Sequence, residues 1–327
     1  MKFEDFKIVA TASQVPERVV DNHELSTMMD TSDEWIVKRT GIKRRHIAVT
    51  ETTSSLCTSV AQQLLAQSEL QPDDIDLIVV ATMSPDYLTP STSATVQGNI
   101  GATKAMAFDI DAACSGFVYG LKLIRQMLMA DHKKNAILIG GETLSKLLDW
   151  SDRSTAVLFG DGAGGVLVTN ETTADGSYLA DSMTTLGSLG GYLTAGKTGQ
   201  PSPFSSDHQP FKPFFKMNGR RVYQFAVKNV PDSVNHALSV AKLAPTDVDH
   251  YVLHQANVRI VERIADELEL PMTKFPVNIG EFGNTAAASE PILLDQLVKH
   301  NIIKRGDTIA LSGFGGGLTV GTMLLTY

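Results

Sequence analysis

The chain has 327 residues, of which 43% are apolar and 20% are charged, and its formal net charge is −8. This composition is ordinary for a globular protein, so it excludes disordered and fibrous classes, and the acidic balance argues against nucleic-acid binding. No apolar run reaches the ~20 residues of a membrane helix, no secretion signal opens the chain, and two cysteines exclude a disulfide scaffold, so we expect a cytoplasmic protein without a membrane segment.

Short apolar runs alternate with segments of helical period along the chain. The predicted strands are rich in Val, Ile and Leu and lack polar alternation, which is typical of strands buried on both faces. They cover 77–81, 107–110, 136–139, 165–168, 251–253 and 308–311. Apolar stripes at helical spacing lie between them, at Phe117, Leu121, Ile124 and Leu128 and again at Val261, Ile264 and Leu268. Strands that alternate with helices predict an α/β fold with mainly parallel sheets.

The chain also contains a weak internal repeat. Residues 72–81 resemble residues 245–254, and each segment follows a predicted helix and runs into a strand. Further along, each half offers a turn of small residues before a new helix, at 111–116 and 281–286. We therefore predict duplicated halves, 1–174 and 175–327, whose sheets stack around shared helices. The segment 170–217, rich in Gly, Ser, Thr and Pro, is expected to hold the boundary and a loop over the site.

Cys114 lies between the predicted strand 107–110 and a predicted helix that starts near Ser115. A helix N-terminus offers unpaired backbone N–H groups and a partial positive charge, which lower the pKa of a thiol and favour a nucleophilic thiolate. Small neighbours on both sides leave the sulfur approachable. The alternative is a buried, inert cysteine, and that is the interpretation we favour for Cys57, which shares an apolar helical stripe.

Two further polar residues follow a strand or a turn in the second half. His254 comes directly after strand 251–253, at the carboxyl end where ligands gather in open α/β sheets. Asn284 precedes a stretch of small residues, and its ordinary role there is to cap a helix. A structural histidine and a helix cap are the plain alternatives. The repeat places the turns of Cys114 and Asn284 at comparable positions, so the three side chains are predicted to converge on one pocket.

Two glycine-rich stretches need separate interpretation. Residues 160–165 fit the G-x-G-x-x-G pattern of dinucleotide sites, but that pattern requires a helix to follow, and the next residues predict a strand, so we reject nucleotide binding there. Residues 312–317 follow a predicted strand, and glycine there lets backbone N–H groups approach a reacting carbonyl, as an oxyanion hole requires. A simple tight turn is the alternative.

Several motifs, taken in order, resemble one family. The chain is similar over almost its whole length to the thiolase superfamily and, within it, to the β-ketoacyl-[acyl carrier protein] synthase III family. The most specific motifs are Ser-Asp-Glu-Trp-Ile-Val-Lys-Arg-Thr-Gly-Ile at 32–42, Asp-Ala-Ala-Cys-Ser-Gly-Phe at 111–117, Phe-Gly-Asp-Gly-Ala-Gly at 159–164, His-Gln-Ala-Asn at 254–257 and Gly-Asn-Thr at 283–285. The resemblance implies a thiolase fold with a five-layer α-β-α-β-α architecture, in a homodimer.

The resemblance also implies a reaction that starts type II fatty acid synthesis. Cys114 would take a short acyl group from acyl-CoA, and malonyl-[acyl carrier protein] would then enter. His254 and Asn284 would stabilise the enolate formed as carbon dioxide leaves, and the enolate would attack the acyl-cysteine to give a 3-oxoacyl-[acyl carrier protein]. The backbone N–H groups of Cys114 and Gly316 would form the oxyanion hole. Both thioesters are substrates, and neither a cofactor nor a metal is implied.

Binding residues follow from the same resemblance. Trp35 and Arg153 would sandwich the CoA adenine, because an indole and a guanidinium both stack on a purine. Arg39 would meet the phosphate or pantetheine groups of CoA, with a surface salt bridge as the alternative. The acidic acyl carrier protein would contact a segment that consists of Gln255, Ala256, Asn257, Val258 and Arg259.

Two residues depart from the family pattern. Glu290 stands where an apolar residue is more usual and Val320 where tryptophan is frequent, so both are expected to alter packing near the pocket.

Rival functions are a polyketide synthase or a hydroxymethylglutaryl-CoA-type synthase of the same superfamily, and a non-catalytic acyl-binding homologue. The hydroxymethylglutaryl type would require a glutamate acid/base, for which we find no matching motif, and the intact Cys, His and Asn set argues against the non-catalytic homologue.

Overall fold

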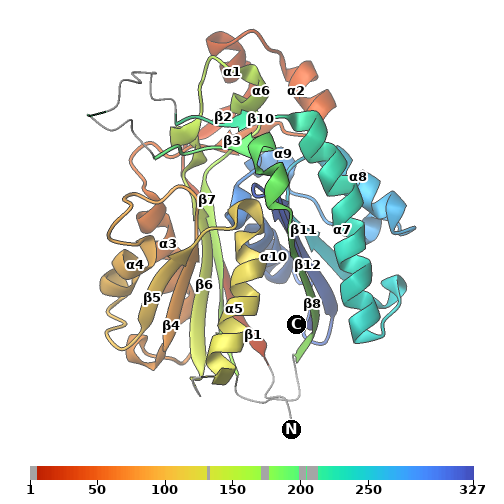
Figure 1. Cartoon of the computed structure of the whole chain (residues 1–327). Coiled ribbons are helices and arrows are strands. Elements are labelled where there is room, and N and C mark those ends of the chain that lie inside the picture. Colours follow the sequence, from red (N-terminus) through yellow and green to blue (C-terminus); the bar gives the residue numbers. More distant parts are fainter. Residues whose placement is uncertain (1–5, 131–132, 171–176, 199–203, 205–212) are drawn as a thin grey trace.

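Two β-sheets lie side by side with helices between them and on both outer faces (Figure 1). The structure is a computed structural model and describes residues 6–130, 133–170, 177–198, 204 and 213–327. The first sheet has the strand order β1-β7-β6-β4-β5, and the second has the order β11-β12-β13-β8. Their bounds are β1 (Lys7–Gln14), β4 (Leu77–Ala81), β5 (Met106–Ile110), β6 (Asn135–Glu142) and β7 (Gly162–Thr169), then β8 (Ser177–Thr185), β11 (His250–Leu253), β12 (Thr308–Gly315) and β13 (Thr319–Thr326).

Three helical layers alternate with the sheets. Helices α3 (Thr53–Ala66) and α4 (Thr92–Ile100) cover the outer face of the first sheet, and α7 (Gly219–Ala241) covers the outer face of the second, with α8 (Val258–Glu267) beside it (Figure 1). Helices α5 (Gly116–Ala130) and α10 (Ser289–Lys299) lie between the sheets and contact both. This order confirms the predicted five-layer α-β-α-β-α architecture.

The strand directions differ from the prediction. β4 pairs in parallel with β5 and β6, and β11 pairs in parallel with β12. However, β7 and β13 each run antiparallel to both of their neighbours, so the prediction of mainly parallel sheets is wrong. For β12 and β13 the reason is their connection, which is a short turn, whereas a parallel pair needs a long crossover.

Smaller elements gather at one end of the sheets, at the top of Figure 1. They are α1 (Asn22–Met28), α2 (Asp33–Thr40), α6 (Arg153–Ala156) and α9 (Ile279–Phe282), with the strand pairs β2 (Val19–Asp21) with β3 (Arg44–His46) and β9 (Leu193–Thr194) with β10 (Lys216–Met217). Short 3₁₀ turns connect the larger elements: η1 (Pro72–Asp74), η2 (Ala113–Ser115), η3 (Leu144–Leu147), η4 (Gly187–Tyr192), η5 (Pro245–Asp247), η6 (Met272–Lys274) and η7 (Ala286–Ala288).

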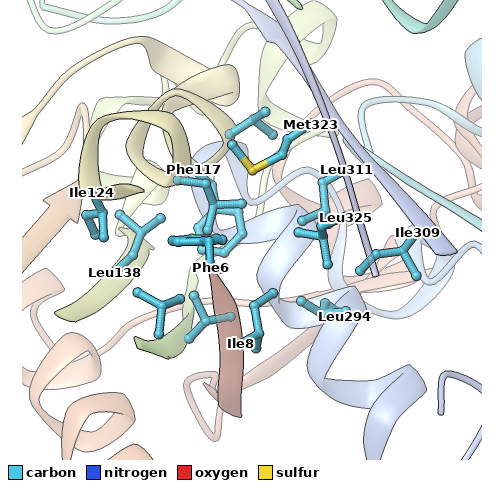
Figure 2. Packing of buried hydrophobic residues seen from close by; sticks show 14 of the residues in the cluster. Phe6, Ile8, Phe117, Ile124, Leu138, Leu294, Ile309, Leu311, Met323 and Leu325 are labelled. Atoms are coloured by element: carbon cyan, nitrogen blue, oxygen red, sulfur yellow. The ribbon is translucent and has the colours of Figure 1, made fainter. Parts of the chain in front are cut away.

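The main core fills the space between the two sheets (Figure 2). Phe117, Ile124 and the rest of the predicted stripe on α5 are fully buried there, against Leu138 of the first sheet and Leu311 of the second. The second predicted stripe, on α8, is also buried, in a separate cluster under α7. Burial of the α5 stripe together with Leu293, Leu294 and Leu297 of α10 fixes these two helices as a shared middle layer. The turns described below lie at the starts of both helices.

The internal repeat is visible in the backbone. η1 and η5 have the same form, in which the carboxylate of Asp74 or Asp247 accepts a hydrogen bond from the backbone N–H three residues earlier. Each of these turns leads into a strand of one of the two sheets, since η1 precedes β4 and η5 precedes β11.

The predicted boundary between residues 174 and 175 lies outside the described residues. In the described ranges, no helix is both long enough and apolar enough to cross a membrane.

Candidate active site

One cavity of about 1330 Å³ brings the predicted catalytic residues together. Cys114, His254 and Asn284 all line it, although they are far apart in the sequence. Each follows an element at the same end of the two sheets: Cys114 comes after β5, His254 comes after β11, and Asn284 comes after α9. The prediction that they converge on one pocket is therefore confirmed.

Cys114 is the middle residue of η2, and η2 directly precedes α5. The turn that holds it is fixed by Asp111, whose Oδ1 accepts a hydrogen bond from the backbone N–H of Ala113 at 2.8 Å. Ala113 has a φ of 48°, a left-handed conformation that turns the chain sharply into the helix. Gly315 of the second sheet packs directly on this turn, and a Cβ there would lie 2.8 Å from the backbone nitrogen of Cys114.

The electrostatics of the thiol differ from the expectation. Cys114 is only 5% exposed, and burial raises the pKa of its thiol well above the usual value, with further upward contributions from the carboxyl groups of Glu290, Glu142 and Asp111. Its own backbone N–H opposes this shift. The prediction of a lowered thiol pKa is thus contradicted, because the Gly-rich end of β12 excludes water from the helix tip. The resting sulfur is a thiol, and a reaction at this residue needs a group that takes its proton.

His254 extends from the end of β11 into the cavity wall. Its backbone N–H donates to the carbonyl of Ser312 at 2.8 Å, which ties it to β12. Its ring packs edge-on against Phe314, with centroids 5.0 Å apart, and its Nδ1 lies 2.5 Å from the hydroxyl of Ser289. Burial lowers the pKa of His254 to about 3, so the imidazole is neutral at ordinary pH and holds one proton, on either Nδ1 or Nε2.

Asn284 is held by its backbone on both sides. Its N–H donates to Leu158 at 2.9 Å, and its carbonyl accepts from the N–H of Gly160 at 3.0 Å. Its side-chain Oδ1 accepts from the backbone N–H of Ala286 at 2.9 Å, so the Nδ2 end of the amide is left as the donor to a ligand. The alternative role of helix cap is wrong, because the N-cap residues of η7 and α10 are Thr285 and Ala288. The Oδ1 bond instead fixes the turn before η7, and it leaves the other end of the amide as a donor.

The two glycine-rich stretches also have clear positions. β7 begins within the 160–165 stretch, as the rejection of a dinucleotide site required, and Gly160 holds Asn284 instead. Gly316 lines the cavity beside Ala113, at the turn between β12 and β13. Its part in an oxyanion hole stays a prediction.

The predicted CoA residues lie at the cavity mouth. Trp35 on α2 has the Arg39 guanidinium 4.6 Å and the Arg153 guanidinium 5.3 Å from its ring centroid, and all three line the cavity. Arg153 also pairs with Asp30 at 3.2 Å. The mouth therefore offers a flat aromatic face flanked by two exposed cations, which suits a nucleotide with phosphate groups.

The predicted carrier-protein segment divides into a buried and an open part. Gln255 is 1% exposed, and its side chain bonds to the backbone at Leu253 and Asn278, so it supports the segment from within. Ala256, Asn257 and Arg259 line the cavity, whereas Val258 packs beneath α2. Asn257 caps α8, and its Nδ2 donates to the carbonyl of Arg39.

No group of three or more His, Cys, Asp or Glu residues in the described parts of the chain is arranged to hold a metal.

Sequence reasoning missed three groups around the site. Ser289 contacts the ring of His254, Phe314 packs against that ring, and Glu142 is a buried carboxyl that bonds to Ser84 and Thr82. Burial raises the pKa of Glu142 to about 8. None of the three has a local signal, because each contact joins segments that only the tertiary fold brings together. Glu290 did carry a signal in the sequence, because it is a charged residue at a position where an apolar residue is more usual.

Comparison with known proteins places this geometry in a family. The family profiles "3-Oxoacyl-[acyl-carrier-protein (ACP)] synthase III" and "3-Oxoacyl-[acyl-carrier-protein (ACP)] synthase III C terminal" match residues 108–187 and 238–327. A beta-ketoacyl-[acyl-carrier-protein] synthase III of Lactobacillus helveticus (strain DPC 4571) is 74% identical over 327 residues, which is 100% of both chains.

Solved structures agree with the sequence relatives. The 3-oxoacyl-[acyl-carrier-protein] synthase III of Aquifex aeolicus VF5 superposes with a TM-score of 0.92 at 41% identity, over 98% of this chain and 100% of that one. The priming β-ketosynthase of the R1128 polyketide biosynthetic pathway also has a TM-score of 0.92, at 31% identity, over 99% of this chain and 96% of that one. The chain thus belongs to the 3-oxoacyl-[acyl-carrier-protein] synthase III family and is an acyl-transferring condensing enzyme of fatty acid synthesis with the thiolase fold.

Proposed function

We propose that Cys114 is the nucleophile that carries the acyl group between the two half-reactions. A short acyl-CoA enters through the mouth at Trp35, and the sulfur attacks its thioester carbonyl, which forms an acyl-cysteine and releases CoA. The observation that carries this assignment is that Cys114, His254 and Asn284 line one cavity together with Trp35, which lies beside the exposed guanidinium groups of Arg39 and Arg153. The acyl thioester on Cys114 keeps the reactivity needed for the second half-reaction.

In the second half-reaction, malonyl-[acyl carrier protein] occupies the cavity with its thioester oxygen between His254 and Asn284. As carbon dioxide leaves, negative charge develops on that oxygen, and hydrogen bonds from His254 Nε2 and Asn284 Nδ2 stabilise it. The enolate carbon attacks the acyl-cysteine and gives the 3-oxoacyl product. A neutral imidazole and an amide suit this step, because it needs fixed donors rather than a strong base.

The backbone N–H groups of Cys114 and Gly316 form the oxyanion hole for the tetrahedral intermediates. Support comes from the close packing of the glycine turn on η2, which brings two backbone segments to the reacting carbon. Backbone donors of this kind accelerate acyl transfer by about 10²–10³-fold each, because they are already oriented when the charge develops.

Both thioester carriers bind at the same mouth. Trp35, with Arg39 and Arg153, receives the CoA nucleotide, and Arg259 at the start of α8 faces the acidic carrier protein, with Ala256, Asn257 and Val258 beside it. Arg259 is exposed and its guanidinium bonds to the carbonyl of Lys38, which positions it at the rim. Gln255 acts only by supporting this segment.

Cofactor use, assembly and cellular location complete the proposed function. The thioester bonds supply the activation, so the reaction runs without a bound cofactor or metal. Each chain contains the two halves 1–174 and 175–327, and two such chains pair as a homodimer in the cytoplasm. The edge strand β5 supports the dimer, because Met106 on it is 40% exposed, and Tyr87 and Leu88 in the connection between β4 and α4 are 69% and 79% exposed, which is unusual for large apolar side chains.

Starter synthesis for polyketides is the second candidate, because a priming β-ketosynthase shares the fold at 31% identity. Product analysis separates the two. The protein is incubated with acetyl-CoA and either malonyl-[acyl carrier protein] or malonyl-CoA, and the products are identified by mass spectrometry, with Cys114→Ala as the control. We expect a single 3-oxoacyl-[acyl carrier protein] product that requires the carrier protein. Multiple extensions from malonyl-CoA alone would favour the polyketide function, and no acyl-enzyme at all would favour a binding protein.

A further inference from the structure

A buried glutamate lies behind His254 and has no part in the reaction described above. Glu290 is the second residue of α10, and its side chain is fully buried. Its Oε2 lies 3.0 Å from the hydroxyl of Ser289, and that hydroxyl lies 2.5 Å from Nδ1 of His254. The three side chains therefore form one continuous hydrogen-bonded chain that ends on an imidazole in the cavity wall.

The Ser289 hydroxyl can join this chain in two ways. Its oxygen also accepts from the backbone N–H of Gln255 at 3.3 Å, so one lone pair and one proton remain for its two other neighbours. In the first arrangement, Ser289 donates to Glu290 and Nδ1–H of His254 donates to Ser289, so Nε2 carries no proton. In the second, a protonated Glu290 donates to Ser289, Ser289 donates to Nδ1, and Nε2 carries the proton.

The surroundings of the carboxyl let it change between these states. Glu290 Oε1 is buried and has no hydrogen-bond partner within the described ranges. A side chain at Gly313 would collide with Oε1, so glycine leaves room for the carboxyl next to the Cys114 turn. Burial raises the pKa of Glu290 well above its usual value, and burial lowers the pKa of His254 to about 3, so a proton added to this chain goes to the carboxyl and does not form an imidazolium.

We propose that Glu290 is a positioning residue that stores the proton released from Cys114 and thereby sets which nitrogen of His254 is protonated. The inference rests on the proposed roles of Cys114 and His254. It answers two needs of the reaction at once: acylation requires an acceptor for the thiol proton, and decarboxylation requires a donor at Nε2. His254 and Cys114 contact adjacent residues of β12, Phe314 and Gly315, so both face the same small region.

The proton transfers balance over one cycle. During acylation, the S–H bond of Cys114 breaks while the sulfur bonds to the acyl carbon, and the bond from that carbon to the CoA sulfur breaks. The thiol proton passes to Nε2, the Nδ1 proton passes to Ser289, and the Ser289 proton passes to the Glu290 carboxylate. The negative charge leaves on the CoA thiolate, which takes a proton from solvent. After condensation, the Cys114 thiolate recovers its proton by the reverse path.

Other titratable groups near α10 define what else could affect a pH profile. On the helix itself, Asp295 accepts from Thr11 and Ser13 and pairs with Lys299 at 2.7 Å. The elements packed against α10 contribute Glu142 from β6, His250 from β11 and Lys7 from β1, and Glu290 itself acts on the Cys114 thiol. His250 pairs with Asp307 at 3.5 Å, and Asp111 acts on the Cys114 thiol from the preceding turn. Of these groups, only Glu290 is joined to His254 by hydrogen bonds.

The test measures acylation and condensation separately in the variant Glu290→Gln. Glutamine keeps the shape and can donate to Ser289, but it cannot accept the proton. We measure the rate of acetyl transfer from acetyl-CoA to Cys114 by rapid quench and intact mass across pH, and then the single-turnover condensation of the fully acylated protein with malonyl-[acyl carrier protein]. The matched control is Asp295→Asn, a buried carboxyl on the same helix without contact to His254.

We expect Glu290→Gln to slow acylation by at least about tenfold and to lose the wild-type pH dependence of that step, while condensation changes by less than about threefold. Asp295→Asn should keep the wild-type pH profile. Equal rates and equal profiles in Glu290→Gln and wild type would overturn the inference, and so would an equal loss in both steps with the profile unchanged. If Glu290→Gln does not fold, Ser289→Ala interrupts the same chain and must show the same acylation loss. Failure of the wild type itself to acylate would instead contradict the proposed function.

Discussion

The turn that carries Cys114 and the turn that carries Asn284 share one backbone design. In each, a side-chain oxygen accepts from the backbone N–H two residues later, Asp111 at 2.8 Å and Asn284 at 2.9 Å. In each, the residue that donates is an alanine with positive φ, 48° at Ala113 and 44° at Ala286, and a 3₁₀ turn then enters a middle-layer helix. The structural equivalent of Asn284 is therefore Asp111, three residues before the nucleophile.

This equivalence corrects the predicted alignment and shows how the halves diverged. The position that matches Cys114 in the second half is Ala287, which is fully buried. At the other position, the carboxylate of Asp111 is exposed, whereas the amide of Asn284 is 7% exposed in the cavity wall. The same turn thus holds a nucleophile in one half and a hydrogen-bond donor in the other, so the chemistry depends on single side chains on a common scaffold.

The largest expected effect comes from removing the nucleophile. Cys114→Ala should abolish the acyl adduct in intact mass and lower condensation by at least about 10⁴-fold, because the first-half turn would then resemble its inert counterpart. Cys57→Ala, which removes the buried cysteine of α3, should retain the adduct. An adduct in Cys114→Ala would place the nucleophile elsewhere.

Asn284→Asp makes the second turn match the first. The hydrogen bond from the backbone N–H of Ala286 should survive, since Asp111 accepts the same bond from Ala113. The Nδ2 donor is lost and a buried acid is introduced, so single-turnover condensation should fall by about 10²–10³-fold. Acylation should stay within about threefold, since the sulfur and its turn are unchanged. A variant that condenses at the wild-type rate would show that Asn284 only fixes the turn before η7.

The contact between the second sheet and the first-half turn is tested by Gly315→Ala. The new Cβ would lie 2.8 Å from the Cys114 backbone nitrogen, which displaces the nucleophile. Because a displacement of about 1 Å can cost 10²-fold, we expect acylation to slow by about 10–100-fold. Gly98→Ala on α4 is the control, because a Cβ there meets nothing within 4 Å. Equal acylation rates in both variants would argue against close packing at the sulfur.

The smallest effect is expected from Asp111→Asn, the reverse of the Asn284 exchange. Asparagine preserves the hydrogen bond from Ala113 but removes a charge that raises the pKa of the Cys114 thiol, behind the larger contributions of burial, Glu290 and Glu142. The thiolate is the form above the pKa, so alkylation of Cys114 should reach its half-maximal rate at a lower pH than in wild type. At a fixed neutral pH the gain should be about twofold at most, since Asp111 is exposed and screened by water. A shift of the half-maximal alkylation rate to higher pH would contradict the conclusion that the Asp111 charge raises the pKa of the Cys114 thiol.

Local pattern and long-range packing explain which predictions succeeded. β4 was predicted with its observed bounds, Leu77–Ala81, because a run of bulky apolar residues needs no distant information to identify it. The β8 strand was missed, because its sequence mixes Ser, Asp, Met and Thr, and its pairing with β13 makes it a strand. The Cys114 environment was predicted incorrectly, since its burial depends on a glycine turn about two hundred residues away. Family motifs located the site, but not the chain through Ser289 behind it.

The central claim is that one half supplies the nucleophile and the other half supplies the donors. The most direct test is an intact-mass chase. Wild type, His254→Ala and Asn284→Ala are first acylated with acetyl-CoA, and malonyl-[acyl carrier protein] is then added. The account predicts that all three acquire the acyl group on Cys114 and that only wild type transfers it promptly to product. If either variant discharges its acyl group as fast as wild type, the division of labour between the two halves is contradicted.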